Sequence, residues 1–491
     1  MPVHWLEAYV VLAGIVLLML EAFLPQKEKS LIACLGIGAL VFGLVLLFVV
    51  DPPSNNAEMA RFYAFDAQAK FFKGFTLVAS ILALILCLDY RKVLAKFTAN
   101  PDSEDSTGEY YCLILFACAG MMWMASAKDL ISLFVSLELT TITLYILVAY
   151  MRRNVGSLEA GVKFLILGAL STGFLVYGIA WLYGATGTTS LAGIGERMTE
   201  ENSTYLLFGL SLILISLAFK IGAVPMHLWI PDVYQGAPTP TTAFLSVASK
   251  ASGFAVALRV LEPFFTNPLT AEKTTFIVAV LAGATILLGN LAAIPQTNFK
   301  RLLAYSSIAN AGFILLGIAS WNSGGQLSAF QVTGFYLSVY LLMTFAAFFI
   351  LAAIHSDSGS DEIAAFEGLS SRNPALALLT TIVVGALAGL PLTAGFFGKL
   401  FVFQAAVNAN LWIPIALAFV GVAAGFYYYF QIIRAMYWRK SLETRAVKVR
   451  PLSFYVVATL TALIVILGFF PQPIHWLIGV KSPETTVVDD E

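Results

Sequence analysis

Apolar residues form long runs along almost the whole chain, and short polar segments separate them. A run of about 20 residues is what an α-helix needs to cross the hydrocarbon core of a bilayer. We therefore expect an all-α polytopic membrane protein. The runs predict fourteen transmembrane helices, at residues 5–25, 31–50, 71–90, 109–127, 129–151, 158–184, 203–231, 238–262, 273–295, 299–320, 327–354, 373–405, 411–437 and 453–479.

The composition supports a membrane protein and argues against several other classes. The chain has 491 residues, of which 59% are hydrophobic and only 12% charged, whereas soluble domains carry about 25% charged residues. A net charge of -1 argues against a nucleic-acid partner, and no nucleotide-binding glycine fingerprint follows a predicted strand. The four cysteines lack CxxC spacing, so we expect buried apolar residues and no metal or iron–sulfur site at Cys34, Cys87, Cys112 and Cys118.

Positive residues are distributed unevenly between the predicted loops. The loops after odd-numbered spans hold fifteen lysines and arginines, and the loops after even-numbered spans hold six. Because cytoplasmic loops are enriched in these residues, the odd-numbered loops are expected to face the cytoplasm. Both termini then lie on the outer, periplasmic side, which requires an even number of spans and agrees with fourteen.

Two predicted spans contain a helix breaker near a lysine. The seventh carries Lys220 and then Pro225, and the twelfth carries Pro391 and then Lys399. Proline inside a helix removes a hydrogen bond and costs about 3 kcal/mol or more. Interrupted helices at membrane depth are tolerated where the freed backbone lies against protein or a wet cavity. We therefore predict that the seventh and twelfth helices are discontinuous and border a hydrated polar site.

The two interrupted spans are five apart, which is typical of a transporter built from repeats. The repeats would comprise spans four to eight and spans nine to thirteen. An odd number of spans in each repeat makes the two inverted relative to each other. The predicted organisation is therefore an N-terminal three-helix segment, a first repeat, a second inverted repeat and a C-terminal part with the last helix, at residues 1–108, 109–262, 273–437 and 438–491.

Four ionisable residues lie deep inside predicted spans. Glu138 is near the middle of the fifth span, and Lys220, Lys250 and Lys399 are inside the seventh, eighth and twelfth. Each charge at a helix centre costs about 2.5–3.5 kcal/mol on the insertion scale, whereas an ordinary domain is stable by only about 5–15 kcal/mol. Residues this costly indicate function, and one acid with three lysines predicts a proton relay.

Other charged residues have two interpretations at this stage. Lys163 is about five residues inside the sixth span, roughly 8 Å deep, so it either joins the relay or reaches the cytoplasmic surface. His227 and Asp232 border the first break, where they either line an entrance or satisfy free backbone groups. Arg259 is expected to extend to the membrane surface, and Glu7 is expected to lie at the interface.

The residues around the first break resemble a known family. The segment FKIGAVPMHLWIPDVYQGAPTPTTAFLSVASK is similar to the most characteristic stretch of the antiporter-like membrane subunits of bacterial respiratory NADH:quinone oxidoreductase, complex I. The run DVYQGAP favours the subunit N branch of this family. The resemblance extends over nearly the whole chain through the segments SLELTTITLY, SLEAGVKFLIL, QTNFKRLLAYSSIANAGF and GLPLTAGFFGKLFVF.

The resemblance implies a proton path and assigns its residues. The family's proton-path acid matches Glu138, and its broken-helix lysine matches Lys220. The connecting lysine of the next span matches Lys250, the terminal lysine of the twelfth span matches Lys399, and the sixth-span lysine matches Lys163. Protons would enter from the cytoplasm near Lys250, move along the membrane plane and leave by way of Lys399.

One position departs from the family pattern. In the tenth span, relatives place a histidine where this chain has Asn310. Asparagine does not titrate, so a proton-carrying role at this position is in doubt. Water or a nearby hydroxyl group such as that of Ser306 would have to stand in.

The resemblance also implies a setting for the chain. No flavin, iron–sulfur or quinone site is expected in this subunit, because the NADH, FMN, iron–sulfur clusters and quinone belong to other subunits. The implied partners are the other membrane subunits of complex I, including the antiporter-like subunit M and the small subunit K, together with the lipid bilayer. The implied location is the bacterial inner membrane.

Two other functions are compatible with the sequence. A subunit of a multi-subunit sodium/proton antiporter shares the predicted fold, although the absence of a second buried acid disfavours a dedicated sodium site. A structural membrane spacer is the third interpretation, and the deep lysines count against it. Related membrane-bound hydrogenases and photosynthetic complexes use similar subunits and remain possible host assemblies.

Overall fold

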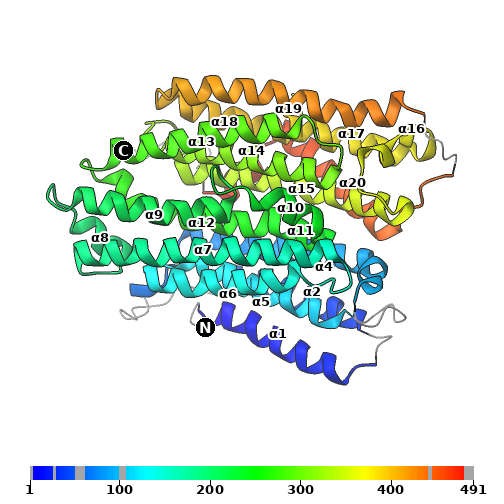
Figure 1. Ribbon diagram of the computed structural model, residues 1–491, viewed down its shortest axis with the longest axis horizontal. Coiled ribbons are helices and arrows are strands. Elements are labelled where there is room, and N and C mark those ends of the chain that lie inside the picture. The colour runs from blue at the N-terminus through cyan, green and yellow to red at the C-terminus, as the bar shows by residue number, and fades with distance from the viewer. Residues whose placement is uncertain (1–3, 26–28, 50–60, 99–106, 441–444, 480–491) are drawn as a thin grey trace, which may run out of the picture.

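The computed structural model describes residues 4–25, 29–49, 61–98, 107–440 and 445–479. It is a bundle of long helices that run side by side, as Figure 1 shows. Within the described residues, 13 helices are long and apolar enough to cross a membrane. A further span is divided into the shorter helices α17 (Pro374–Ala388) and α18 (Ala394–Asn408). The fourteen predicted spans are therefore present, and the chain is an all-helical membrane protein.

The helices of the N-terminal half follow the predicted order. They are α1 (Trp5–Phe23), α2 (Ser30–Val49), α4 (Ala67–Lys96), α5 (Gly108–Ser126), α6 (Leu130–Val148), α7 (Val155–Thr186), the short α8 (Leu191–Glu196), α9 (Ser203–Ile221), α10 (Trp229–Gly236), α11 (Thr239–Phe244), the π-helix η2 (Leu245–Ser249) and α12 (Lys250–Thr266).

The helices of the C-terminal half complete the bundle. Besides α17 and α18, they are α13 (Ala271–Ala293), α14 (Phe299–Ala319), α15 (Ala329–Ser358), the 3-10 helix η3 (Ile363–Phe366), α16 (Leu369–Arg372), α19 (Trp412–Trp438), α20 (Pro451–Phe469) and α21 (Gln472–Leu477).

Local sequence signals define where the membrane helices begin. Many of them start directly after a short polar side chain that accepts a hydrogen bond from a free backbone N–H of the first turn. Asp129 caps α6, Asn154 caps α7, Asn298 caps α14 and Ser328 caps α15 in this way. A single polar residue of this kind marks the start of the next helix, so consecutive membrane helices need only short connections.

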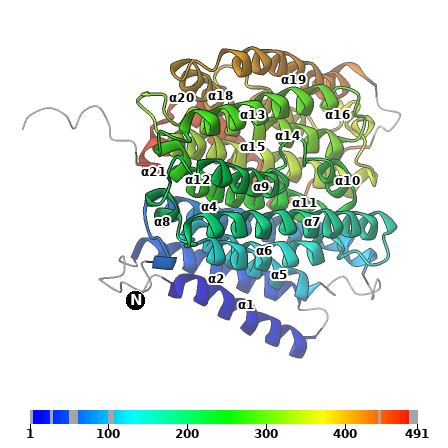
Figure 2. The ribbon, with the colours of Figure 1, turned by 60° about the vertical axis from the view of Figure 1, so that its left-hand side comes forward.

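The helices form an edge-to-edge array with a buried centre. In Figures 1 and 2, α1 lies along one edge and α19 along the opposite edge, with α12 between them. The apolar part of the span that contains α12 is fully buried, whereas those of α1, α2, α7 and α19 are only 33% buried. Lys250 and Arg259 on α12 are therefore in the interior, and the outer helices face lipid or a neighbouring protein.

The structure corrects several sequence-based expectations. The seventh span ends as a helix at Ile221, and the last span ends at Phe469, because Pro471 starts the separate helix α21. The eighth span contains the π-helix η2, which the sequence did not predict. Cys34 is exposed, although the other three cysteines are buried as expected. The prediction that both termini face the periplasmic side concerns residues outside the described ranges. The repeats and the domain boundaries also stay predictions.

Candidate functional site

The break in the seventh span is a compact turn between α9 and α10. Gly222 ends α9 in the left-handed conformation, with φ of 78°, and the Val224–Pro225 peptide bond is cis. The Val224 N–H donates to Thr285 Oγ1 at 3.0 Å, and Trp229 Nε1 donates to the Phe219 carbonyl at 3.0 Å. Backbone groups that the interruption leaves without helical hydrogen bonds are therefore hydrogen-bonded to side chains of the protein. Such partners are needed in the membrane, where the hydrocarbon core supplies no water.

Lys220 lies in the last turn of α9, directly before this break. Its side chain is buried with 5% of its surface exposed, and its Nζ donates to Thr141 Oγ1 on α6 at 3.3 Å. Glu138 is three residues before Thr141 on α6, so the two side chains share one face of that helix. Thr141 thus connects the predicted broken-helix lysine to the face that carries the predicted acid, and the described residues show no direct ion pair between Glu138 and Lys220.

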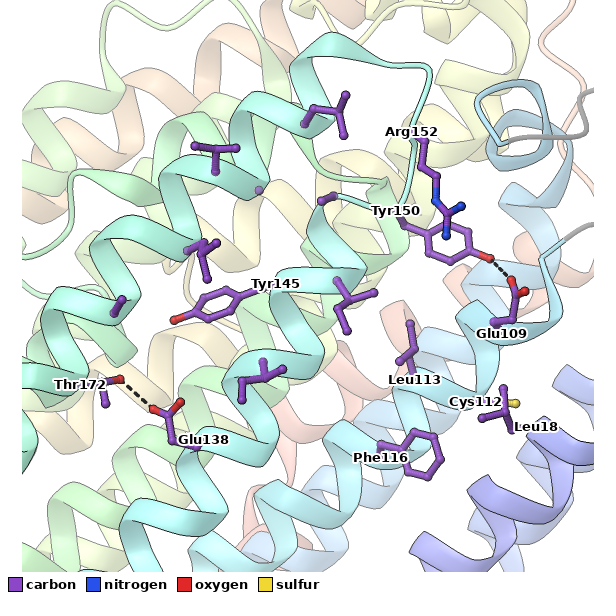
Figure 3. Close-up of a pocket in the computed structure, with 18 residues that line it drawn as sticks. Leu18, Glu109, Cys112, Leu113, Phe116, Glu138, Tyr145, Tyr150, Arg152 and Thr172 are labelled. Atoms are coloured by element: carbon purple, nitrogen blue, oxygen red, sulfur yellow. Dashed lines mark hydrogen bonds between the residues drawn. The ribbon is translucent and has the colours of Figure 1, made fainter.

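Glu138 lies toward the outside of the helix bundle. Its Oε1 accepts a hydrogen bond from Thr172 Oγ1 of α7 at 2.7 Å, as Figure 3 shows. The carboxylate borders a groove of about 1190 Å³ between α1, α5, α6 and α7. Much of the groove is apolar and exposed, including Ile142 at 53% and Val162 at 55%. The acid therefore faces a surface that lipid or a neighbouring subunit would cover.

Lys250 follows the π-helix and is more deeply buried than Lys220 and Lys399, the other two lysines of the predicted relay. It is 2% exposed, and its Nζ donates to the Ser307 carbonyl of α14 at 2.8 Å. A Cβ atom added at Gly222 would stand 3.3 Å from this Nζ, and one added at Gly253 would stand 3.1 Å from Lys220 Cγ. The break of α9 and the start of α12 therefore bring Lys220 and Lys250 into the same region.

An uncharged hydrogen-bonded cluster occupies the position of Asn310. Tyr336 donates to Asn310 Oδ1 at 2.7 Å, and Asn310 Nδ2 donates to the Ser306 carbonyl at 2.8 Å. The Ser306 hydroxyl is hydrogen-bonded to the hydroxyl of Tyr429 on α19. Asn310 is therefore surrounded by hydroxyl groups on α14, α15 and α19. The sequence identified Ser306 as a candidate. Tyr429 is in a tyrosine run, Tyr427–Tyr429, that also fits the family, but neither Tyr429 nor Tyr336 was predicted at this site, because nothing in a linear pattern links α14 to α15 and α19.

Lys399 lies after the break in the twelfth span and contacts that break directly. Its Nζ donates to the carbonyls of Leu387 and Ala388 at 3.1 and 2.7 Å, at the end of α17. It also lies over the Phe313 ring, 5.4 Å from the centroid. Gly389 ends α17 in the left-handed conformation with φ of 93°. Pro391 follows in the exposed turn between α17 and α18.

Lys163 and Asp232 form a separate network away from the buried lysines. Lys163 Nζ pairs with Asp232 at 2.8 Å and with Glu159 at 2.7 Å, and its side chain is 42% exposed. Arg301 Nη1 pairs with the other oxygen of Asp232 at 2.8 Å. His227 lies in the first break, where its Nδ1 is buried without a hydrogen bond among the described residues. Asp232 therefore joins α7, α10 and α14 by ion pairs.

Glu7 and Arg259 form ion pairs that the sequence did not predict, and that of Glu7 is fully buried. Glu7, expected at the interface, is fully buried and pairs with Lys73 at 2.8 Å, while Tyr63 donates to the same carboxylate. Arg259, expected to extend to the surface, is 7% exposed and pairs with Asp66 through two hydrogen bonds of 3.0 and 2.8 Å. A charge near the end of an apolar run gives no signal of its partner, so these pairs could not be predicted.

The comparisons with known proteins identify the class to which this fold belongs. The family model for the NADH:quinone oxidoreductase/Mrp antiporter transmembrane region matches residues 127–425. A second family model, the NfeD integral membrane domain, matches residues 1–88. The first match contains both interrupted helices and all four relay candidates, Glu138, Lys220, Lys250 and Lys399. The chain is thus an antiporter-like membrane subunit.

Similar sequences place the chain within one branch of that class. It is 41% identical over 440 residues to NADH-quinone oxidoreductase subunit N of Heliobacterium modesticaldum, covering 89% of this chain and 90% of that protein. It is 36% identical over 483 residues to subunit N of Desulfitobacterium hafniense, covering 95% of each. The chain belongs to the NADH-quinone oxidoreductase subunit N family.

Solved structures share the fold over nearly the full length. A chain of respiratory complex I from Thermus thermophilus has a TM-score of 0.78 at 30% identity, covering 97% of this chain and all of that one. A chain of the archaeal membrane-bound sulfane sulfur reductase has a TM-score of 0.81 at 26% identity, covering 96% and 95%. A chain of the Mrp complex from Dietzia has a TM-score of 0.80 at 19% identity, which shows the fold alone.

Proposed function

We propose that this chain is a proton-translocating subunit of a bacterial NADH:quinone oxidoreductase. The observation that supports this proposal most strongly is the position and surroundings of the Lys220 side chain. This buried lysine directly precedes the break in its helix and makes one long hydrogen bond to Thr141, which lies one helical turn after Glu138 on α6. A buried ammonium group without a close counter-ion changes its protonation readily when a nearby charge moves.

The proposed relay consists of Glu138, Lys220, Lys250 and Lys399. Protons enter from the cytoplasm, reach Lys250, and leave on the outer side by way of Lys399. The charge asymmetry of the loops indicates which side is the cytoplasm, and the direction of travel is the one that the resemblance to the family implies. Lys163 remains a predicted member at the rim, with its protonation state tied to the carboxylate of Asp232.

The proposed setting is the inner membrane, with both termini on the periplasmic side. The relatives are named as subunits of an oxidoreductase, and solved relatives lie within respiratory membrane complexes. We assign the groove beside Glu138 to contact with a neighbouring membrane subunit, for which subunits M and K are the candidates. Redox cofactors and quinone belong to other subunits, and this chain supplies the proton path.

The test is Lys220→Ala in the assembled complex, with Lys273→Ala as the matched control, because Lys273 is exposed at the start of α13. NADH oxidation and proton pumping are measured in the same inverted membrane vesicles, with and without sodium. Loss of both activities in Lys220→Ala, at normal assembly and independent of sodium, supports the proposal. Normal pumping by an assembled Lys220→Ala complex contradicts it, and a sodium requirement indicates the antiporter alternative.

A further inference from the structure

Tyr336 on α15 stands between the Asn310 cluster and Lys399. Its hydroxyl group donates to Asn310 Oδ1 at 2.7 Å. Its ring lies nearly parallel to that of Phe313, at an interplanar angle of 17° and a centroid distance of 6.3 Å. Lys399 Nζ lies over the Phe313 ring, 5.4 Å from the centroid. Direct contacts therefore lead from Asn310 through two aromatic rings to the ammonium group of Lys399.

The ring of Tyr336 also contacts the backbone beside Lys399. A Cβ atom added at Gly398, the residue before Lys399, would stand only 3.3 Å from Tyr336 Cδ2. Tyr336 and Phe313 are each 2% exposed, so both rings belong to the packed interior. Because such an interior deforms little and transmits strain, a displacement of the tyrosine ring would shift both Phe313 and the start of α18.

Asn310 lies midway between the points where two lysines of the proposed relay contact α14. Ser307, three residues earlier, supplies the carbonyl that accepts from Lys250 Nζ, and Phe313, three residues later, contacts Lys399. Residues three apart share one face of a helix and are separated by roughly 4.5 Å along its axis. Asparagine does not titrate, so whatever Asn310 contributes at this point comes from its hydrogen bonds.

The amide group of Asn310 is held at both ends. Its Oδ1 accepts from Tyr336, and its Nδ2 donates to the Ser306 carbonyl at 2.8 Å and lies 3.3 Å from the Ser306 hydroxyl. That hydroxyl is in turn hydrogen-bonded to Tyr429 of α19. The amide oxygen is therefore fixed toward α15, where it serves as the acceptor for Tyr336.

Lys399 has no carboxylate beside it among the described residues. Its helix packs against α14, α15, α17, α19 and α20, of which only α15 contains an acid, Asp357, 21 residues after Tyr336. His355 also lies at that end of α15, and Lys300 and Arg301 are at least 12 residues before Phe313 on α14.

The other titratable groups of these five helices are tyrosines and Arg434, which keep their charge near neutral pH. Those nearest the Asn310 cluster are Tyr336, Tyr340, Tyr428 and Tyr429. The ammonium group of Lys399 therefore depends on two carbonyls at the end of α17 and on the face of the Phe313 ring.

We propose that Tyr336 and Asn310 are positioning residues for Lys399 and that they act through the ring of Phe313. This inference rests on the proposed function, in which Lys399 is the last station of the relay. The face of an aromatic ring attracts an ammonium group but not a neutral amine. Asn310 fixes Tyr336, Tyr336 supports Phe313, and Phe313 helps Lys399 to keep its proton. Position 310 thus serves the relay without carrying a proton itself.

The first test is the pH dependence of proton pumping by the assembled complex in inverted vesicles, from about pH 6.5 to about pH 9. Phe313→Leu removes the ring but keeps an apolar side chain. Pumping should then begin to fall at a pH lower by about half a unit or more, because the ring no longer favours the charged form of Lys399. NADH oxidation is measured in the same vesicles.

Phe349→Leu is the matched control for this variant. Phe349 is completely buried on α15, and it lies 13 residues after Tyr336, roughly 20 Å along the helix. Its replacement removes a similar amount of packing without touching the surroundings of Lys399. It should lower the thermal stability of the complex and leave the pH profile where it is.

Three variants test the hydrogen bond between Tyr336 and Asn310. Tyr336→Phe removes only the hydroxyl group, and Asn310→Val removes its acceptor. Both should move the pH profile in the same direction as Phe313→Leu, but by less. Asn310→His again offers an acceptor to Tyr336, so it should move the profile less than Asn310→Val. Tyr427→Phe, which removes the hydroxyl group of an exposed tyrosine on α19, is the control and should leave the profile unchanged.

The outcomes separate this inference from a structural defect and from the proposed function. A structural defect lowers pumping by the same factor at every pH, and such a result in Phe313→Leu, or a wild-type profile, overturns the inference. An equal shift in Asn310→His and Asn310→Val also overturns it. If the Asn310 variants do not assemble, Tyr336→Phe decides in their place. If Lys220→Ala stops pumping while Phe313→Leu and Tyr336→Phe keep the wild-type profile, the proposed function stands and this inference alone fails.

Discussion

The two interrupted helices satisfy their free backbone groups in different ways. At the first break, two neutral side chains do this: Thr285 Oγ1 accepts from the Val224 N–H, and Trp229 Nε1 donates to the Phe219 carbonyl. The ammonium group of Lys220 donates to Thr141 Oγ1 on α6 instead. At the second break, the ammonium group of Lys399 itself donates to two carbonyls at the end of α17. The same residue type therefore stands beside both breaks in two different structural roles.

This difference indicates how each lysine responds to a change in charge. Lys220 can lose a proton without loosening the turn beside it, because other groups hold that turn. Lys399 lies at the negative end of α17, where a cation is favoured, and its charged hydrogen bonds are stronger than neutral ones. Deprotonation of Lys399 should therefore loosen the second break, whereas deprotonation of Lys220 should leave the first break unchanged.

The largest expected effect comes from removing the second ammonium group. Lys399→Met leaves two carbonyls without their donor, at a cost of about 1–3 kcal/mol for each buried group. Lys220→Met removes one long contact and a buried charge without a close partner, so stability should stay near that of the wild type. The thermal stability of both detergent-solubilised complexes, measured side by side, checks this. Equal losses would show that the two lysines play the same structural role.

The second-largest loss of stability is expected at the two glycines that end the helices before the breaks, Gly222 and Gly389. Gly222→Ala and Gly389→Ala each place a side chain in the left-handed region, at a cost of about 1–2 kcal/mol. A Cβ at Gly222 would also overlap the Ile230 side chain, whereas the nearest atom at Gly389 is Cδ of Lys399 at 3.0 Å. Gly222→Ala should therefore destabilise the complex more. Thermal unfolding ranks the two variants, and the reverse order would mean that the second break is the more rigid one.

The smallest effect should follow the loss of one neutral donor at the first break. Trp229→Phe keeps most of the packing but removes the hydrogen bond to the Phe219 carbonyl, which is worth about 0.5–1.5 kcal/mol. Pumping should persist, because Lys220 does not hold the turn. Proton pumping and thermal stability of the assembled variant provide the check. A complete loss of pumping would show that Lys220 depends on this hydrogen bond for its function. The two lysines would then not differ in the way proposed above.

Much of the fold was predictable because its signals are local. Apolar runs and short polar caps located the spans, and a proline beside a lysine located both interrupted helices. The depth of Lys220 and Lys250 also followed from their positions in those runs, and both are buried. The roles assigned to the relay residues stay predictions, since the structure gives their surroundings and not their proton transfers.

The rest depends on contacts between distant segments. Tyr336 and Tyr429 meet Asn310 and Ser306 only because α15 and α19 pack beside α14. The π-helix before Lys250 contains ordinary helix-compatible residues, so composition does not indicate its wider turn. Lys300 is at the very start of the tenth predicted span, yet it is 3% exposed and paired with Asp361. Sequence patterns give the depth of a residue along its own helix but not the neighbours on other helices.

The buried pair of Glu7 and Lys73 has a consequence for biosynthesis. Glu7 is in α1, and its partner Lys73 belongs to α4, which is synthesised after both α1 and α2. Until α4 is made, α1 carries a carboxyl group whose partner in the folded protein has not yet been synthesised. The contribution of this ion pair to the stability of α1 in the bilayer is therefore gained only when α4 arrives. The N-terminal helices thus mature as a group during membrane insertion, and a chain truncated between them should be a substrate for degradation.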